Sequence, residues 1–304
     1  MQNRPIKGRG FYRLKGFCEE RVCDMRQVDT AEIKAALKEI LGKIAFVYPE
    51  DIHESLLAAR EEETGVSQDA MDMLVCNAEI AENEHIPICQ DTGMVTVYLK
   101  IGQDVHLSGM LLKDAVNEAV AESYTQNYLR ASVVDDPLFD RFNTKDNTPC
   151  VLYTDITAGE SIEIEAAAKG FGSENMSRVA MLKPAQGEEG VKQFVLDTIK
   201  EAGPNACPPM VVGVGIGGTF DYAAVMAKKA LCLGFDYRDT DERYNALMDE
   251  LLEKANALRV GPMGLHGKTT VLHLNILHYP THIAGMPVAV NICCHACRHE
   301  RRVL

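Results

Sequence analysis

The chain has 304 residues, of which 46% are hydrophobic and 25% charged, so it is globular and long enough to bury a large core. Acidic residues outnumber basic ones by 44 to 31, and the net charge of −13 argues against binding to nucleic acid or to an anionic membrane. No window reaches the roughly 20 apolar residues of a membrane span, and no apolar secretory segment opens the chain, which together predict a cytoplasmic protein.

Residues 1–24 carry basic side chains without any helical or strand period, and we expect them to form a disordered extension before a folded unit over residues 25–304. Asp29 and Glu32 then have the spacing of a capping box, and the apolar residues after them repeat with the period of a helix. Two more helices are expected over 50–63 and 67–84.

From residue 94 onward the pattern becomes mixed. Residues 151–157 and 161–168 alternate with period two around Ala158-Gly159-Glu160, which predicts a hairpin or adjacent strands. The remaining expected strands are 94–101, 210–214, 269–277 and 287–292, and the remaining expected helices are 112–129, one that ends at Gly203, 219–231 and 240–258. No internal repeat is visible. The fold class is therefore mixed α/β, with a helical N-terminal part followed by mixed strands and helices.

A Gly-x-Gly-x-x-Gly pattern runs from Gly213 to Gly218, after an expected strand and before an expected helix. This context is the one that a dinucleotide-binding fingerprint requires, so an NAD-dependent oxidoreductase has to be considered. Against it, the strand is short and no complete second βαβ unit follows. The alternative is a glycine-rich turn where the backbone closely approaches another segment.

The ten cysteines are too sparse for a small disulfide scaffold, so some of them are candidates for metal or catalytic ligands. Cys89, Cys207 and Cys294 lie in junctions between elements and not on apolar faces. Three loop thiolates of this kind suit either an iron–sulfur cluster or zinc. Zinc held by Cys293, Cys294 and Cys297 alone is a further possibility, although the spacing matches no ordinary zinc ribbon.

Gln90 and Asp91 follow Cys89 directly and would bring an amide and a carboxylate beside any metal bound there. A purely structural zinc site needs neither group, so this neighbourhood favours a reactive metal centre. Asp91 alone could equally be a turn or N-cap residue.

Five motifs resemble those of class I, iron–sulfur-dependent fumarate hydratases. They are Pro87-Ile-Cys-Gln-Asp-Thr-Gly93, Lys169-Gly-Phe-Gly-Ser-Glu-Asn175, Cys207-Pro-Pro with Val214-Gly-Ile-Gly-Gly218, Pro280-Thr-His-Ile-Ala284 and Cys294-His-Ala-Cys-Arg298. The resemblance covers residues 25–298 and is to the α subunit of the two-chain form. The α subunit of L-tartrate dehydratase is similar in layout.

The resemblance implies a [4Fe–4S] cluster bound by three protein thiolates, Cys89, Cys207 and Cys294, the last because it begins the Cys-His-x-x-Arg pattern. It implies that Asp91 and His282 are catalytic. The substrate-contact positions that it implies are Gln90, Asp91, Arg130, Gly172 and Asn175. His266 stands where the family is expected to have glycine.

The implied activity is reversible hydration of fumarate to (S)-malate, with a cluster iron acting as a Lewis acid. The implied partners are a small dicarboxylate substrate and a β subunit that completes the active site, in a hetero-oligomer of αβ units. An L-tartrate dehydratase α subunit is the alternative within the same chemistry. A non-enzymatic metal-binding subunit would account for the cysteines and leave Gln90, Asp91 and Arg130 without a role.

Overall fold

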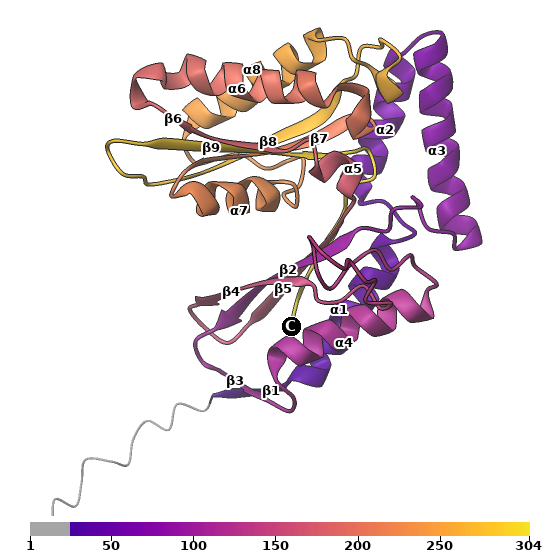
Figure 1. Ribbon diagram of the computed structural model, residues 1–304, viewed down its shortest axis with the longest axis vertical. Helices are drawn as coiled ribbons and strands as arrows, with labels where there is room; N and C mark the ends of the chain where they lie inside the picture. Colours follow the sequence, from indigo (N-terminus) through magenta and orange to yellow (C-terminus); the bar gives the residue numbers. More distant parts are fainter. Residues whose placement is uncertain (1–24) are drawn as a thin grey trace, which may run out of the picture.

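The computed structural model describes residues 25–304, and the extension expected over residues 1–24 lies outside this range. The chain forms two lobes, each built around a four-stranded sheet, and a helical hairpin packs beside the second lobe (Figure 1). The expected mixed α/β class is confirmed. Among residues 25–304, none of the helices has the length and apolar character needed to cross a membrane.

The first lobe has helices α1 and α4 packed on a sheet of order β10-β5-β2-β4. Strand β2 lies at its centre, parallel to β4 and antiparallel to β5. Its elements are β1 (Arg26–Asp29), α1 (Thr30–Ile44), β2 (Met94–Gly102), β3 (Val105–Ser108), α4 (Leu112–Gln126), β4 (Val151–Thr157), β5 (Ile162–Lys169) and β10 (Arg298–Val303). Helix α1 begins with the expected capping box of Asp29 and Glu32.

The second lobe has a sheet of order β6-β9-β7-β8, with α6 and α8 on one face and α7 on the other (Figure 1). Its elements are β6 (Arg178–Leu182), α6 (Gly187–Ala202), β7 (Met210–Gly217), α7 (Phe220–Ala230), α8 (Glu242–Ala257), β8 (Val271–Tyr279) and β9 (Met286–Cys293). The three helices and three of these strands were expected, with ends that differ by a few residues.

Helices α2 (Glu50–Glu62) and α3 (Val66–Glu84) form a hairpin that leads from the first lobe to the side of the second. Its apolar face shares a core with Val211, Leu231 and Cys293 of the second lobe. Glu63, between the two helices, accepts hydrogen bonds from the backbone N–H groups of Lys268 (3.0 Å) and Thr269 (2.6 Å). The hairpin is therefore fixed to the second lobe by both apolar and polar contacts.

The prediction that residues 151–157 and 161–168 form a hairpin or adjacent strands is wrong. Strands β4 and β5 are both present, but they lie on opposite sides of β2 and do not pair with each other. The reason is that β2 is buried along most of its length and needs a hydrogen-bonded neighbour on each edge. Strands β6 and β10, which the sequence pattern did not indicate, then complete the two sheets.

The two sheets have the same connectivity. In each, a central strand leads through a connection that contains a helix to a parallel strand on one side, and then to an antiparallel strand on the other side. The order is β2-β3-α4-β4-β5 in one, where β3 pairs with β1 outside the sheet, and β7-α7-α8-β8-β9 in the other. The next strand crosses to the opposite sheet, since β6 pairs with β9 and β10 pairs with β5. The crossing segments, 170–177 and 294–297, therefore meet between the lobes, beside the starts of β2 and β7.

Candidate functional site

The three loop cysteines come together where the lobes join. Cys89 precedes β2, Cys207 precedes β7 and Cys294 follows β9, which are corresponding ends of the two sheets. The N–H of His295 donates to the carbonyl of Cys207 (3.3 Å), and Cys89 and Cys294 border the same apolar core. Burial raises the pKa of the Cys207 thiol, and the charges of Cys294 and Cys89 raise this pKa further. The three thiols are thus close enough to influence one another's ionisation.

The neighbouring cysteines are in a different environment. Cys293 and Cys297 are buried, whereas Cys89 and Cys294 are half-buried and Cys207 is exposed. Among residues 25–304, no three His, Cys, Asp or Glu side chains are arranged to hold a single metal ion. Zinc bound by Cys293, Cys294 and Cys297 is therefore not supported. A cubane cluster has a different requirement, because each thiolate binds its own iron and the thiolates stand farther apart than the ligands of one ion.

Two buried cations flank Cys294. Lys169 is at the end of β5, and its ammonium contacts the hydroxyl of Ser173 (2.9 Å) and the carboxylate of Glu174 (3.4 Å). Arg298 opens β10 and is 2% exposed. Its Nη2 donates to the carbonyl of Asp91 (2.7 Å), while its Nε and Nη1 have no hydrogen-bond partner among the described residues. The hydrogen bond with Cys293 and burial together hold the pKa of the Cys294 thiol well above its usual value, and the charges of Lys169 and Arg298 act against this effect.

The donor set fits an iron–sulfur cluster. Three thiols from three loops face one region between the lobes, and buried N–H groups without a partner lie beside them. Unpaired buried donors are uncommon in folded proteins, and sulfur acceptors at this point would satisfy them.

Asp91 connects the Cys89 turn to the first crossing segment. Its Oδ1 accepts from the N–H of Gly93 (3.0 Å) and its Oδ2 accepts from the N–H of Phe171 (2.8 Å), at the start of the short helix α5 (Phe171–Glu174). The carboxylate thus has the turn geometry that the sequence left open. Gln90 beside it is exposed, with its Oε1 3.4 Å from the Cys89 sulfur.

The other candidate substrate residues lie around this turn. Thr92 donates its hydroxyl to the carbonyl of Arg130 (2.8 Å), which holds the exposed Arg130 next to Asp91. Gly172 and Asn175 are exposed on and just after α5. A Cβ added at Gly172 would meet no protein atom within 4 Å, so open space lies beside this glycine. Gln90, Asp91, Arg130, Gly172 and Asn175 therefore belong to one region of the surface.

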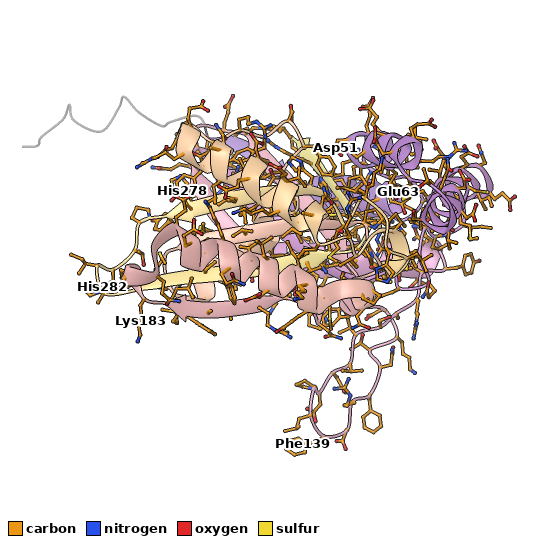
Figure 2. The ribbon with its side chains drawn as sticks, turned by 90° about the horizontal axis from the view of Figure 1, so that it is seen from above. Asp51, Glu63, Phe139, Lys183, His278 and His282 are labelled. Carbon is orange, nitrogen blue, oxygen red and sulfur yellow. The ribbon has the colours of Figure 1, made fainter. Side chains whose placement is uncertain are left out.

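His282 is not part of this region. It lies in the loop between β8 and β9, at the opposite end of β9 from Cys294 (Figure 2). The eight residues of β9 span about 25 Å at the usual rise of a strand. The His282 side chain is exposed, and its Nδ1 accepts from the N–H of Ala284 (3.2 Å). Within one chain, His282, which the resemblance implies is catalytic, is thus separated from Cys89, Cys207 and Cys294.

The glycine-rich run from Gly213 to Gly218 brings helix α7 close to strand β7. A Cβ at Gly213 would be 2.0 Å from the carbonyl oxygen of Ala227, and one at Gly215 would be 2.1 Å from that of Ala223. The close-approach interpretation is therefore confirmed. The dinucleotide interpretation is not supported, because β7 has a parallel neighbour only in β8 and its other neighbour, β9, is antiparallel.

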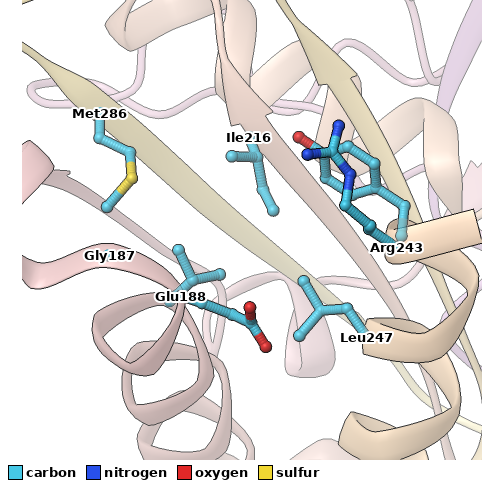
Figure 3. A pocket seen from close by; sticks show the side chains of 8 residues that line it. Gly187, Glu188, Ile216, Arg243, Leu247 and Met286 are labelled. Atoms are coloured by element: carbon cyan, nitrogen blue, oxygen red, sulfur yellow. The ribbon is translucent and has the colours of Figure 1, made fainter. Parts of the chain in front are cut away.

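A cavity of about 290 Å³ lies between the first turns of α6 and α8, over the second sheet (Figure 3). It is lined by Gly187, Glu188, Val191, Ile216, Arg243, Tyr244, Leu247 and Met286. Ile216 is near the end of β7 and Met286 begins β9, so this cavity is at the far end of the sheet from Cys207 and Cys294.

Sequence reasoning missed the residues that surround the thiols. Tyr48, buried after α1, has its hydroxyl 3.0 Å from Nδ1 of His295, next to Cys294. Burial lowers the pKa of His295 to about 4. Lys169 and Arg298 belong to the motifs that resemble the hydratase family, yet nothing in a single sequence indicates that their charges are buried.

His266 has a φ of 63°, in the left-handed region, which agrees with the glycine expected there.

Comparisons with known proteins support one family. The family model described as fumarate hydratase (fumerase) matches residues 34–303. A Methanocaldococcus jannaschii protein, provisionally named L(+)-tartrate dehydratase subunit alpha, is 40% identical over 272 residues, which cover 88% of this chain and 95% of that protein. The L(+)-tartrate dehydratase subunit alpha of Escherichia coli is 33% identical over 261 residues, or 84% of each chain. The chain therefore belongs to the fumarate hydratase (fumerase) family of hydro-lyases.

Proposed function

We propose that this chain is the α subunit of an iron–sulfur hydro-lyase whose substrate is the four-carbon hydroxy acid L(+)-tartrate. The observation that carries the proposal is the meeting of Cys89, Cys207 and Cys294 between the lobes, beside the exposed Gln90–Asp91 turn. An unreactive structural site would not need an open surface with an amide, a carboxylate and a guanidinium around it.

Cys89, Cys207 and Cys294 would hold a [4Fe–4S] cluster, which leaves one corner without a protein ligand. When bound, the cluster supplies a Lewis-acidic iron at that corner, which makes hydroxide a better leaving group without electron transfer.

The chain's own residues would bind and orient the dianionic substrate. The guanidinium of Arg130 offers a planar fork of donors that matches a carboxylate. The amide of Gln90 and that of Asn175 supply further donors on either side of the Asp91 turn. The open space beside Gly172 leaves room for the substrate, and Asp91 keeps this surface assembled through its bonds to Gly93 and Phe171. Asp91 is also our candidate for proton handling.

The substrate is chosen from the relatives. Both relatives carry the name L(+)-tartrate dehydratase, which supports tartrate over the fumarate expected from the sequence motifs. Fumarate, or malate in the reverse direction, is the second candidate, because the family model is described as fumarate hydratase. L(+)-Tartrate and malate differ by one hydroxyl group, so the same carboxylate-binding residues serve either.

A β subunit is the proposed partner, since both relatives are named as alpha subunits. The segment from Arg130 to Asn147 begins and ends at the candidate site, because Asn147 donates to the carbonyl of Gly93 (3.0 Å). It projects from the molecule (Figure 2) and exposes Leu138, Phe139 and Phe142. A partner that covered these side chains would also lie beside Arg130. We also propose that this complex is cytoplasmic.

The test is a substrate comparison on the αβ complex, purified anaerobically with a loaded cluster. We expect oxaloacetate to form from L(+)-tartrate with a higher kcat/KM than that for hydration of fumarate. The opposite ranking would favour the second candidate. A fully loaded complex that converts neither acid would rule out both. The chain without its partner should bind the cluster and turn over either acid far more slowly than the complex.

A further inference from the structure

We propose that Arg298 is a positioning residue for the cluster site, whose buried Nε–H and Nη1–H groups donate to sulfur atoms held at Cys89 and Cys294. This inference rests on the proposed function, because it assumes that the chain binds the cluster. It adds to that function a residue outside the three ligands and the substrate-contact positions.

The first support is that Arg298 is buried without a charge partner. The residue is 2% exposed, and among residues 25–304 no carboxylate oxygen lies within 4.0 Å of its guanidinium. Within the described part of the chain, its one bonded nitrogen is Nη2, which donates to the carbonyl of Asp91. A buried cation is normally paired with an anion, and one that lacks a partner is costly.

The second support is where the guanidinium lies. Arg298 is four residues after Cys294, and the carbonyl it binds belongs to Asp91, two residues after Cys89. Its Nη2 is 3.8 Å from the position that a Cβ would take on Gly170, so the side chain fills the gap between the two crossing segments.

The third support is the contrast with Lys169, the other buried cation at this site. Lys169 has its own partners in Glu174, Ser173 and the carbonyl of Gly170. Its charge is therefore balanced in the protein alone. Arg298 has no such ion pair among the described residues, and the Asp91 carboxylate, which also lies beside Gly170, is bonded instead to the N–H groups of Gly93 and Phe171. Donors from the surroundings to cluster sulfurs raise a cluster's reduction potential and its retention.

The test compares Arg298→Met, Arg298→Lys and the control Arg302→Met in the αβ complex. Arg302 is on the same strand, and its guanidinium pairs with Glu39. Three quantities are measured anaerobically: iron and sulfide content, the midpoint potential of the cluster, and the rate at which a ferrous chelator removes iron. We expect Arg298→Met to lower the potential and to speed iron loss about 10- to 100-fold. Arg298→Lys should recover part of both effects, and Arg302→Met should match the wild type.

The stability of the cluster-free chain separates this role from a purely structural one. If Arg298 serves the cluster, removing its unpartnered charge should leave the thermal stability of the cluster-free chain equal or higher. Wild-type iron content, potential and chelation rate in Arg298→Met would overturn the inference. So would a cluster-free Arg298→Met that fails to fold while Arg298→Lys folds with wild-type cluster properties. A wild-type complex that binds no cluster would instead refute the proposed function.

Discussion

Asp91 has a structural role and a proposed chemical one, and a single substitution can separate them. In Asp91→Asn, the amide oxygen can still accept a hydrogen bond from the N–H of Gly93. The amide NH2 would then face the N–H of Phe171, and since both groups are donors, that hydrogen bond would be lost. We expect the free energy of unfolding to fall by about 1–3 kcal/mol. If Asp91 also handles a proton, kcat should fall by about 100-fold or more. Urea denaturation and the hydro-lyase assay measure the two effects.

The exposed Asp104→Asn is the control, with wild-type values expected for both measurements. A stability loss in Asp91→Asn with unchanged kcat in the loaded complex would restrict Asp91 to the turn.

Glu63 gives a pH-dependent prediction away from the cysteines. Burial raises its pKa, but hydrogen bonds from Lys268, Thr269 and Ser67 outweigh this effect and hold the pKa below the usual value for glutamate. A lowered folded-state pKa adds stability above the unfolded-state pKa of about 4.3, and this stability is lost as the pH falls through the folded-state value. Glu63→Gln should therefore lower the free energy of unfolding at pH 7 by about 1–3 kcal/mol.

The difference between Glu63→Gln and the wild type should shrink as the pH is lowered below about 4, because the wild-type carboxylate becomes protonated. Denaturation curves from pH 3 to 7 measure it. Glu62→Gln is the matched control, since Glu62 is exposed and pairs with Lys268 at the surface, and we expect a change within about 0.5 kcal/mol. A difference for Glu63→Gln that stays constant over this range would contradict the linkage.

At the scale of elements, the packing of α7 on β7 depends on two glycines. The Cβ of an alanine at Gly213 would overlap the carbonyl oxygen of Ala227, so helix and strand would have to separate. We expect Gly213→Ala to cost about 1–3 kcal/mol, as overpacked cores do. Gly42→Ala is the control, because Gly42 is inside α1 with its nearest contact at 3.8 Å, and alanine there should stabilise the helix by up to about 1 kcal/mol.

Urea denaturation of both variants measures these changes. Wild-type stability of Gly213→Ala would mean that α7 shifts freely over the sheet, and the glycine run would then need another explanation.

The elements differ in how well the sequence predicts them. Helices such as α1 follow from a period of 3.6 and a cap, both of which are local signals. Strand partners are not local. Strand β10 pairs with β5, whose paired residues stand 130 to 140 positions earlier in the chain, and its charged sequence Arg298-His-Glu-Arg-Arg lacks an apolar alternation. The pairing of β4 and β5 with β2 escaped prediction for the same reason. The two sheets share one connectivity, but the sequence contains no repeat that would indicate it.

The candidate site shows the same division. The three cysteines became candidates because they stand in junctions between elements and because their motifs resemble a known family. The burial of Arg298 and Lys169, and the separation of His282 from Cys294, depend on where β9 and β10 run. A side chain's position along the sequence does not reveal such distances.

For the whole molecule, the candidate ligands connect the two lobes. Cys89 leads into the central strand of one sheet, Cys207 leads into that of the other, and Cys294 begins the crossing between them. A group bound by all three would hold these segments together, and a ligand that binds only the folded chain stabilises it by mass action. Removing the cluster anaerobically with a chelator should lower Tm and increase amide hydrogen exchange in residues 86–93, 203–210 and 293–298. Exchange in the buried middle of α1 should stay unchanged.

Cys207→Ser tests this coupling without a packing defect. Cys207 is exposed, so serine should leave the stability of the cluster-free chain within about 0.5 kcal/mol of the wild type. The same change removes one thiolate, so the variant should retain less iron and should show the exchange pattern of the chelated protein from the start. Cys76→Ser, at an exposed position on α3, is the control and should behave as the wild type. If Cys207→Ser retained full iron and wild-type exchange, Cys207 would not be a ligand, and the connection of the lobes through a bound cluster would have to be abandoned.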